Sequence, residues 1–333
     1  MTEIFGTLGP ACAQADLIER MFLEGMTGMR LNLSHGGLKE SEPLINSFMQ
    51  AAQRVGIRAD LLIDMQGPEI RIGGLQKPLQ LEESQEAVFV IEHMEQRKDG
   101  VIPVAEHVFS ALEPGSHVLL DDGKLELAVA EKGEQVRAKV LRGGTLYARK
   151  SLKVLGRQIQ APVMTAQDLE NIRLAKDYGV TALMQPFVTE KEQLLTVKNK
   201  LRQNGMNQFR IFAKIENCEG IRNIRDFLPL ADMIVIARGD LGNDMPLWEL
   251  PAAQKELSDI CNSEGKPFLV VTELLASMTQ RPYPTRAEVS DIFHAVTDGA
   301  AAVMVTNETA VGKYPVQVIR YLKKTVEEAE KYR

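Results

Sequence analysis

The sequence predicts an α/β protein, a (β/α)8 TIM barrel with a small antiparallel β domain inserted after its third strand. Three observations support this fold class. Eight short apolar runs with β-branched residues recur along the 333-residue chain, and amphipathic stretches that begin at helix caps and end at glycine separate them. One central segment instead alternates polar and apolar residues between turn signals. Eight parallel strands joined by helices is the number that closes such a barrel.

The predicted barrel strands are the eight apolar runs, at residues 3–9, 28–34, 59–65, 181–187, 209–216, 233–240, 266–274 and 300–308. The segments between them read as helices. In "TAQDLENIRLAKDYG", for example, Thr165 can cap the helix, Asp168 occupies the third helical position and Gly179 closes it. We therefore expect residues 1–71 and 153–333 to form the barrel.

Residues 72–152 break this pattern. Their period is two, and Asp-Gly and Gly-Gly pairs separate alternating strands in "GSHVLLDDGKLELAVAEKGEQVRAKVLRGGTLYARK". This is typical of hairpins in a small antiparallel sheet or barrel. Parallel barrel strands need crossover helices, so we expect this segment to form a separate lobe suited to act as a lid. A structural or interface module is the alternative.

Composition narrows the classes of function. The formal charge of −6 and the pI near 5.6 argue against a general nucleic-acid or membrane-surface binder, so any phosphate site must be local. The three cysteines share no close spacing and suggest neither a disulfide framework nor a thiolate metal cluster. The first residues, "MTEIFGTLGP", lack the features of a signal peptide. We expect a cytoplasmic protein.

Polar and charged side chains gather at the C-terminal ends of the predicted strands, where the active site of a (β/α)8 barrel lies. They are Arg30, Asn32, Ser34, Asp64, Lys214, Glu216, Arg238, Asp240, Thr272, Thr306 and Glu308. Residues two apart on a strand face the same side, so Lys214 and Glu216 should point together. We therefore expect one polar mouth.

The chemistry of this mouth suits an anionic substrate. Glu216 and Asp240 are hard oxygen ligands for a divalent cation, so Mg²⁺ or Mn²⁺ is favoured over zinc. Lys214 could neutralise a phosphoryl group or an enolate, and Arg30 and Arg71 could hold further phosphate oxygens. The plainer alternative is a set of structural ion pairs at the rim, Lys214 with Glu216 and Arg238 with Asp240.

These residues lie in motifs through which the chain resembles the pyruvate kinase family along essentially its whole length. The motifs are "GMRLNLSHG", "IDMQGPEIR", "LLDDGKLEL", "AKIENCEG", "ARGDLG", "PTRAEVSD" and "NETAVGKYP". The resemblance implies transfer of the phosphoryl group of phosphoenolpyruvate to ADP, giving pyruvate and ATP through a Mg²⁺-bound enolpyruvate. It also implies that the inserted β domain closes over the nucleotide.

The resemblance assigns roles residue by residue. Glu216 and Asp240 match the divalent metal ligands, Lys214 matches the lysine that stabilises the phosphoryl group in flight, and Thr272 lies near the face of the enolate that is protonated. The identity of the proton donor stays open. The backbone turn that meets the substrate carboxylate corresponds to Ala237, Arg238, Gly239 and Asp240.

Two further sets follow from the same resemblance. A K⁺ site corresponds to Asn32, Ser34, Asp64 and the carbonyl of Met65, and Glu69 occupies the position whose glutamate accompanies dependence on K⁺. Contacts with nucleotide phosphates or adenosine correspond to Arg30, His35, Arg71 and Pro10. The implied cofactors are Mg²⁺ or Mn²⁺ and K⁺, and the implied partners are phosphoenolpyruvate or pyruvate with ADP or ATP.

The chain also departs from the family pattern. The unusual residues, several of them near the mouth, are Gln66, Pro186, Glu273, Thr306, Asn307 and His294. The family's C-terminal regulatory domain is expected to be absent, which leaves effector control and a homo-oligomer open. A metal-dependent lyase or aldolase acting on a 2-oxo acid through an enolate is one alternative function. A non-catalytic paralogue that binds phosphoenolpyruvate or pyruvate is another.

Overall fold

The computed structural model describes residues 1–67, 70–92, 100–121, 123–157, 159 and 162–333. The chain divides into two compact units, one made of Met1–Gly67 with Val163–Arg333 and the other of Pro68–Pro162. The second unit is longer at both ends than the 72–152 expected from the sequence. The reason is that Leu152–Val154 pairs with a strand of this unit and Arg71 forms a bridge with Ser151.

The first unit is a closed barrel of parallel strands in the order β1-β16-β15-β14-β13-β12-β3-β2. All eight predicted barrel strands are confirmed. Their bounds are β1 Glu3–Thr7, β2 Gly28–Asn32, β3 Asp60–Asp64, β12 Ala182–Gln185, β13 Arg210–Ile215, β14 Met233–Ala237, β15 Phe268–Val271 and β16 Ala302–Met304. Each ends before its predicted limit, so most of the predicted mouth residues lie in the loops and short helices that follow the strands.

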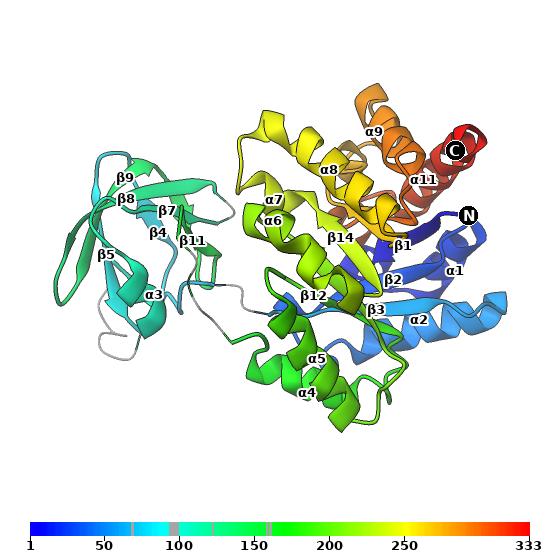
Figure 1. The fold of residues 1–333 in the computed structure, drawn as a ribbon, viewed down its shortest axis with the longest axis horizontal. Coiled ribbons are helices and arrows are strands. Elements are labelled where there is room, and N and C mark those ends of the chain that lie inside the picture. Colours follow the sequence, from blue (N-terminus) through cyan, green and yellow to red (C-terminus); the bar gives the residue numbers. More distant parts are fainter. Residues whose placement is uncertain (68–69, 93–99, 122, 158, 160–161) are drawn as a thin grey trace. The chain divides into compact units, whose positions relative to one another are not determined.

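Helices surround this barrel (Figure 1). They are α1 Ala15–Leu23, α2 Glu42–Val55, α4 Ala166–Leu174, α5 Lys191–Gln203, α6 Cys218–Phe227, α7 Arg238–Gly242, α8 Leu250–Ser263, α9 Arg286–Thr297, α10 Asn307–Ala310 and α11 Pro315–Ala329. The predicted cap of α4 is present as a full capping box, because Thr165 and Asp168 exchange side-chain and backbone hydrogen bonds. Short 3-10 turns include η1 Pro10–Cys12, η2 Leu33–His35 and η5 Ala276–Thr279.

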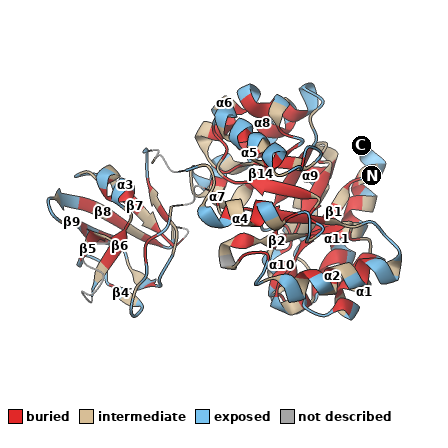
Figure 2. Ribbon diagram, turned by 90° about the horizontal axis from the view of Figure 1, so that it is seen from below, coloured by how far each residue is buried: buried red, intermediate tan, exposed pale blue. Residues whose placement is uncertain are grey.

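Two apolar layers hold the barrel together, and Figure 2 shows the strands as its most buried part. Inward-facing side chains such as Phe5, Met184 and Phe212 fill the interior. A larger layer between strands and helices includes Ile63 and Ile236. The interior is therefore a packed core and not a pore, and the active site of such a barrel lies at the C-terminal ends of its strands.

The second unit is a small β domain with its own apolar core, which includes Phe89, Leu120 and Val140. Its elements are β4 Leu79–Leu81, β5 Glu86–Ile91, β6 Val101–Val104, α3 Glu106–Ala111, β7 His117–Leu120, β8 Leu125–Lys132, β9 Val136–Arg142, β10 Gly144–Leu146 and β11 Leu152–Val154. Pairing is antiparallel as predicted, except that β5 and β6 run parallel. In the part of the chain that the structure describes, no helix is long and apolar enough to span a bilayer.

Candidate active site at the barrel mouth

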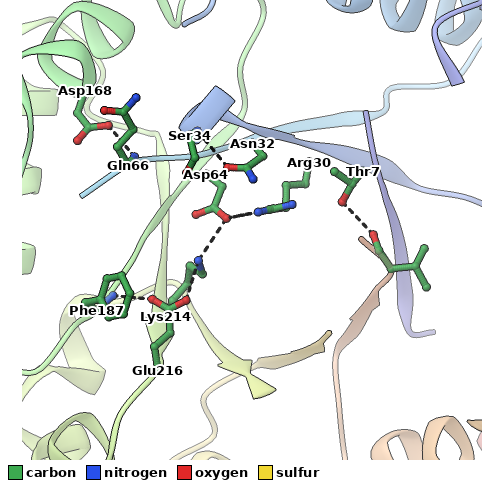
Figure 3. Close-up of polar contacts among 11 residues, drawn as sticks. Thr7, Arg30, Asn32, Ser34, Asp64, Gln66, Asp168, Phe187, Lys214 and Glu216 are labelled. Carbon is green, nitrogen blue, oxygen red and sulfur yellow. Dashed lines mark hydrogen bonds and ion pairs between the residues drawn. The ribbon is translucent and has the colours of Figure 1, made fainter. Parts of the chain in front are cut away.

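Asp64, the last residue of β3, is the centre of a buried charge cluster. Arg30 of β2 donates to Asp64 Oδ2 from Nε at 2.8 Å and from Nη2 at 2.6 Å. Lys214 of β13 places Nζ 3.2 Å from the same oxygen (Figure 3). The Asp64 side chain is only 3% exposed, and those of Arg30 and Lys214 are each 13% exposed. Strands β2, β3 and β13, the last separated from β3 by β12, thus bring two cations and a carboxylate together.

Glu216 extends this cluster just beyond β13. Its Oε1 lies 2.8 Å from Lys214 Nζ, so the two side chains do point together. Its Oε2 accepts a hydrogen bond of 2.8 Å from the backbone N–H of Phe187, which follows β12. Phe187 has a φ of +53°, a left-handed conformation that is uncommon outside glycine. The chain adopts a strained turn at the point where it holds Glu216.

Burial and charge shift the pKa values in this cluster in different directions. Burial alone would raise the pKa of Asp64, but Lys214 and Arg30 outweigh it and hold that pKa below its ordinary value. Burial alone would lower the pKa of Lys214, but Asp64 and Glu216 raise it above its ordinary value. Burial raises the pKa of Glu216, and the charge of Asp240 adds to the rise while Lys214 opposes it. Lys214 therefore stays positively charged at neutral pH.

Asp240 lies in α7, the five-residue helix that starts directly after β14. Ala237 is the N-cap of this helix, and Gly239 is in its first turn. A Cβ placed on Gly239 would come 3.1 Å from Thr272 Cγ2, so the Thr272 side chain lies against this turn. The turn predicted to meet the substrate and Thr272 are therefore neighbours.

The side chain of Arg238 takes a direction that the sequence did not indicate. Its Nε and Nη2 donate to the backbone carbonyl oxygen of Thr272 at 3.1 and 2.6 Å. Its Nη1 lies 2.7 Å from Asp291 Oδ1 on α9 and 3.4 Å from Gln254 Oε1 on α8. The Arg238 guanidinium thus connects the turn after β14 to the loop after β15 and to the outer helices.

The residues matched to a monovalent-cation site lie at the ends of the adjacent strands β2 and β3, where Asn32 pairs with Asp64. Among the described residues, none donates a hydrogen bond to the buried Asp64 Oδ1. Asn32 ends β2, and its Oδ1 accepts a hydrogen bond of 3.1 Å from the backbone N–H of Ser34. Met65 is buried next to Asp64. A buried carboxylate oxygen without a donor is costly unless a cation or water meets it, so the residues fit a cation.

Asp168 is a buried residue of this region whose role sequence reasoning missed. Beyond capping α4, its two carboxylate oxygens accept hydrogen bonds from the backbone N–H groups of Gln66 at 2.9 Å and Gly67 at 3.0 Å. Gly67 has a φ of +59°, and a Cβ there would lie 2.3 Å from Pro186 Cγ. The Thr-x-x-Asp pattern revealed the cap, but nothing in the sequence indicated that the same carboxylate holds the loop after β3.

The carboxylates of Glu216 and Asp240 also fit a divalent ion, with part of its coordination left to other ligands. No group of three or more His, Cys, Asp or Glu side chains close enough to hold a metal occurs in the described part of the chain. Glu216 and Asp240 are close enough for the charge of one to raise the pKa of the other. Such a pair, completed by waters and substrate oxygens, is a common way of holding Mg²⁺.

The remaining predicted residues lie in the turn after β1, in the β unit or outside the described residues. Pro10 is exposed at the start of η1. Arg71 belongs to the β unit, where its Nη1 donates to the carbonyl oxygen of Arg149 at 2.8 Å. Glu69 and the side chain of His35 lie outside the described residues. The nucleotide set therefore stays a prediction, since its members belong to both units or lie outside the described residues.

Fold and mouth together define a (β/α)8-barrel protein with a charged site at the C-terminal ends of its strands, of the class that handles anionic substrates. Comparison with known proteins identifies the family. Residues 1–319 match the family model described as pyruvate kinase, barrel domain. The chain belongs to the pyruvate kinase family.

Three curated relatives are all named pyruvate kinase. The protein of Aeropyrum pernix is 36% identical over 331 residues, which are 99% of this chain and 71% of the relative. The proteins of Staphylococcus haemolyticus and of Staphylococcus aureus strain MRSA252 are each 34% identical, over 99% of this chain and 57% of the relative. The chain thus spans a little over half the length of the two staphylococcal relatives. The comparisons support a pyruvate kinase function and give no support to a lyase or a binding protein.

Proposed function

We propose that this chain transfers the phosphoryl group of phosphoenolpyruvate to ADP, giving pyruvate and ATP, with Mg²⁺ or Mn²⁺ and K⁺ as cofactors. The observation that carries the proposal is the convergence of Arg30 and Lys214 on Asp64 and Glu216 at the barrel mouth. Phosphoryl transfer between two anions needs several positive charges in one site with little water. This cluster supplies two of them on rigid strands.

Each residue of the cluster has a distinct part in this proposal. Lys214, fixed by two carboxylates, neutralises the phosphoryl group as it leaves the substrate. Its raised pKa suits a permanent cation rather than a proton donor. Arg30 binds phosphate oxygens, and Thr272 lies at the enolate face beside Gly239. When bound, the divalent ion, held by Glu216 and Asp240, supplies the charge that keeps these neighbouring carboxylates ionised.

A monovalent cation would be held by Asp64 with Asn32, Ser34 and the carbonyl of Met65. The backbone of Ala237, Arg238 and Gly239 would bind the substrate carboxylate. His35, Arg71 and Pro10 stay predictions for the nucleotide, as does the role of the β unit as a lid. A cytoplasmic location fits the three free cysteines, and a homo-oligomer is a candidate assembly.

The test is the stoichiometry of the reaction. With phosphoenolpyruvate, ADP, Mg²⁺ and K⁺, we expect pyruvate and ATP to form in equal amounts. A lyase would instead turn over oxaloacetate with metal and without ADP. A binding protein would retain phosphoenolpyruvate or pyruvate with no turnover. Either of these outcomes would overturn the proposal.

A further inference from the structure

Thr272 has a backbone conformation that its side chain disfavours. It follows β15 directly and has a φ of +85°, and Glu273 after it has a φ of +57°. A β-branched residue rarely adopts a positive φ, because its side chain then crowds the backbone. Such strain persists only where surrounding contacts over-determine the conformation, and it is common at functional sites.

The peptide that follows Thr272 is contacted by Arg238. Its Nε and Nη2 both donate to the carbonyl oxygen of Thr272, at 3.1 and 2.6 Å. The guanidinium is itself fixed by Asp291 at 2.7 Å, and the Arg238 side chain is only 11% exposed. The guanidinium is charged, planar and fixed in orientation. Its two N–H groups therefore determine both the direction and the distance of the Thr272 carbonyl oxygen.

The register of the barrel explains why Arg238 reaches this carbonyl. Ala237 at the end of β14 pairs with Val271 at the end of β15, so Arg238 and Thr272 are the residues that directly follow two neighbouring strands. The Thr272 methyl group lies against Gly239. Rotation of the Thr272 peptide would therefore move its side chain away from the turn that carries Gly239 and Asp240.

We infer that Arg238 is a positioning residue, which holds the strained Thr272 peptide so that the threonine hydroxyl faces the reacting carbon, with Asp291 orienting the guanidinium. The inference rests on the proposed function. It assigns the Arg238 side chain to Thr272 and not to the substrate. The backbone of residue 238 keeps its separate proposed role.

The test is a double-mutant cycle with Arg238→Lys and Thr272→Ala. Lysine keeps the charge but lacks the fork, so Arg238→Lys should lower kcat about tenfold to a hundredfold, as a misplaced catalytic group does. The KM for phosphoenolpyruvate and the Mn²⁺ affinity should change little. If Arg238 acts through Thr272, the double variant should lose no more activity than the worse single variant. Independent, additive losses would overturn the inference.

Arg210→Lys is the matched control. Arg210 begins β13 at the opposite end of the barrel, where its Nη2 lies 2.6 Å from Asp60 Oδ1. The same substitution there should leave kcat within about twofold, since misplacement matters only near the reacting groups. If kcat fell equally in Arg238→Lys and Arg210→Lys, the effect of Arg238 would be one of stability alone, and the inference would be overturned.

A readout independent of activity separates this inference from the proposed function. Amide hydrogen exchange in the peptide that spans residues 268–275 should speed up in Arg238→Lys and in Asp291→Asn, whether or not the wild type transfers phosphoryl groups. Unchanged exchange in both variants would overturn the inference. Absence of ATP formation by the wild type, with faster exchange in the variants, would instead overturn the proposed function.

Discussion

The substitution Lys214→Met removes the positive charge that the account places next to the transferred phosphoryl group. At about 4 Å and an effective dielectric constant of about 20, one unit charge contributes about 4 kcal/mol. That energy corresponds to about a thousandfold in rate. We therefore expect kcat for ATP formation to fall about a thousandfold while Mn²⁺ binding, measured by titration, is largely retained.

The variant should also be less stable. Lys214 Nζ lies 2.8 Å from Glu216 Oε1 and 3.2 Å from Asp64 Oδ2, and both carboxylates are buried. Breaking a buried pair costs about 3–5 kcal/mol, so folding must be verified by denaturant titration before activity is measured. Lys255→Met, which removes an exposed lysine of α8, is the control and should change neither quantity much. A folded Lys214→Met variant with turnover within tenfold of the wild type, or one that loses Mn²⁺ binding yet retains turnover, would refute the assignment.

Three further predictions concern the same mouth. Because the pKa of Asp64 is held low, its ionised form stabilises the fold above about pH 4, the ordinary aspartate value, and this contribution disappears as the pH falls through the lowered pKa. The gap in unfolding free energy between the wild type and Asp64→Asn should therefore narrow in acid, and a gap that widens there contradicts the charge pairing. Asp168→Asn should lower stability by about 1–3 kcal/mol, because a carboxylate oxygen that accepts a backbone hydrogen bond is lost. It should also raise the K⁺ concentration needed for half-activation. Unchanged K⁺ activation would show that the loop after β3 does not depend on Asp168. Gly67→Ala should destabilise by more than about 1 kcal/mol, because it combines a positive φ with a clash against Pro186; a melting temperature equal to that of the wild type would argue against this packing.

Most of the fold could be predicted from the sequence. Apolar runs alternating with capped helices indicated the eight barrel strands, and the change to a period of two located the β unit after β3. The ends of the strands could not be predicted, because a polar residue after an apolar run can extend the strand or begin a turn. Arg238 and Asp240, for example, lie in the short helix α7 and not in β14.

The site was predictable in its charges and less so in its connections. The alternation of Lys214 and Glu216 was enough to predict that they point together, because residues two apart on a strand share a face. Contacts between distant residues leave no such local signal. Asp168 reaches Gln66 across 102 positions, and Arg238 reaches Thr272 across 34. The positive φ values at Phe187 and Thr272 were also hidden, since neither residue type favours them.

The most direct test of the account is the rate of ATP formation from phosphoenolpyruvate and ADP, with Mg²⁺ and K⁺ each present or omitted. Turnover that requires Mg²⁺ and rises with K⁺ is the predicted result. The proposed sites of the two ions are Glu216 with Asp240 and the Asp64 oxygen to which no described residue donates a hydrogen bond. Absence of turnover in every condition, with phosphoenolpyruvate or pyruvate still bound in the presence of metal, would contradict it.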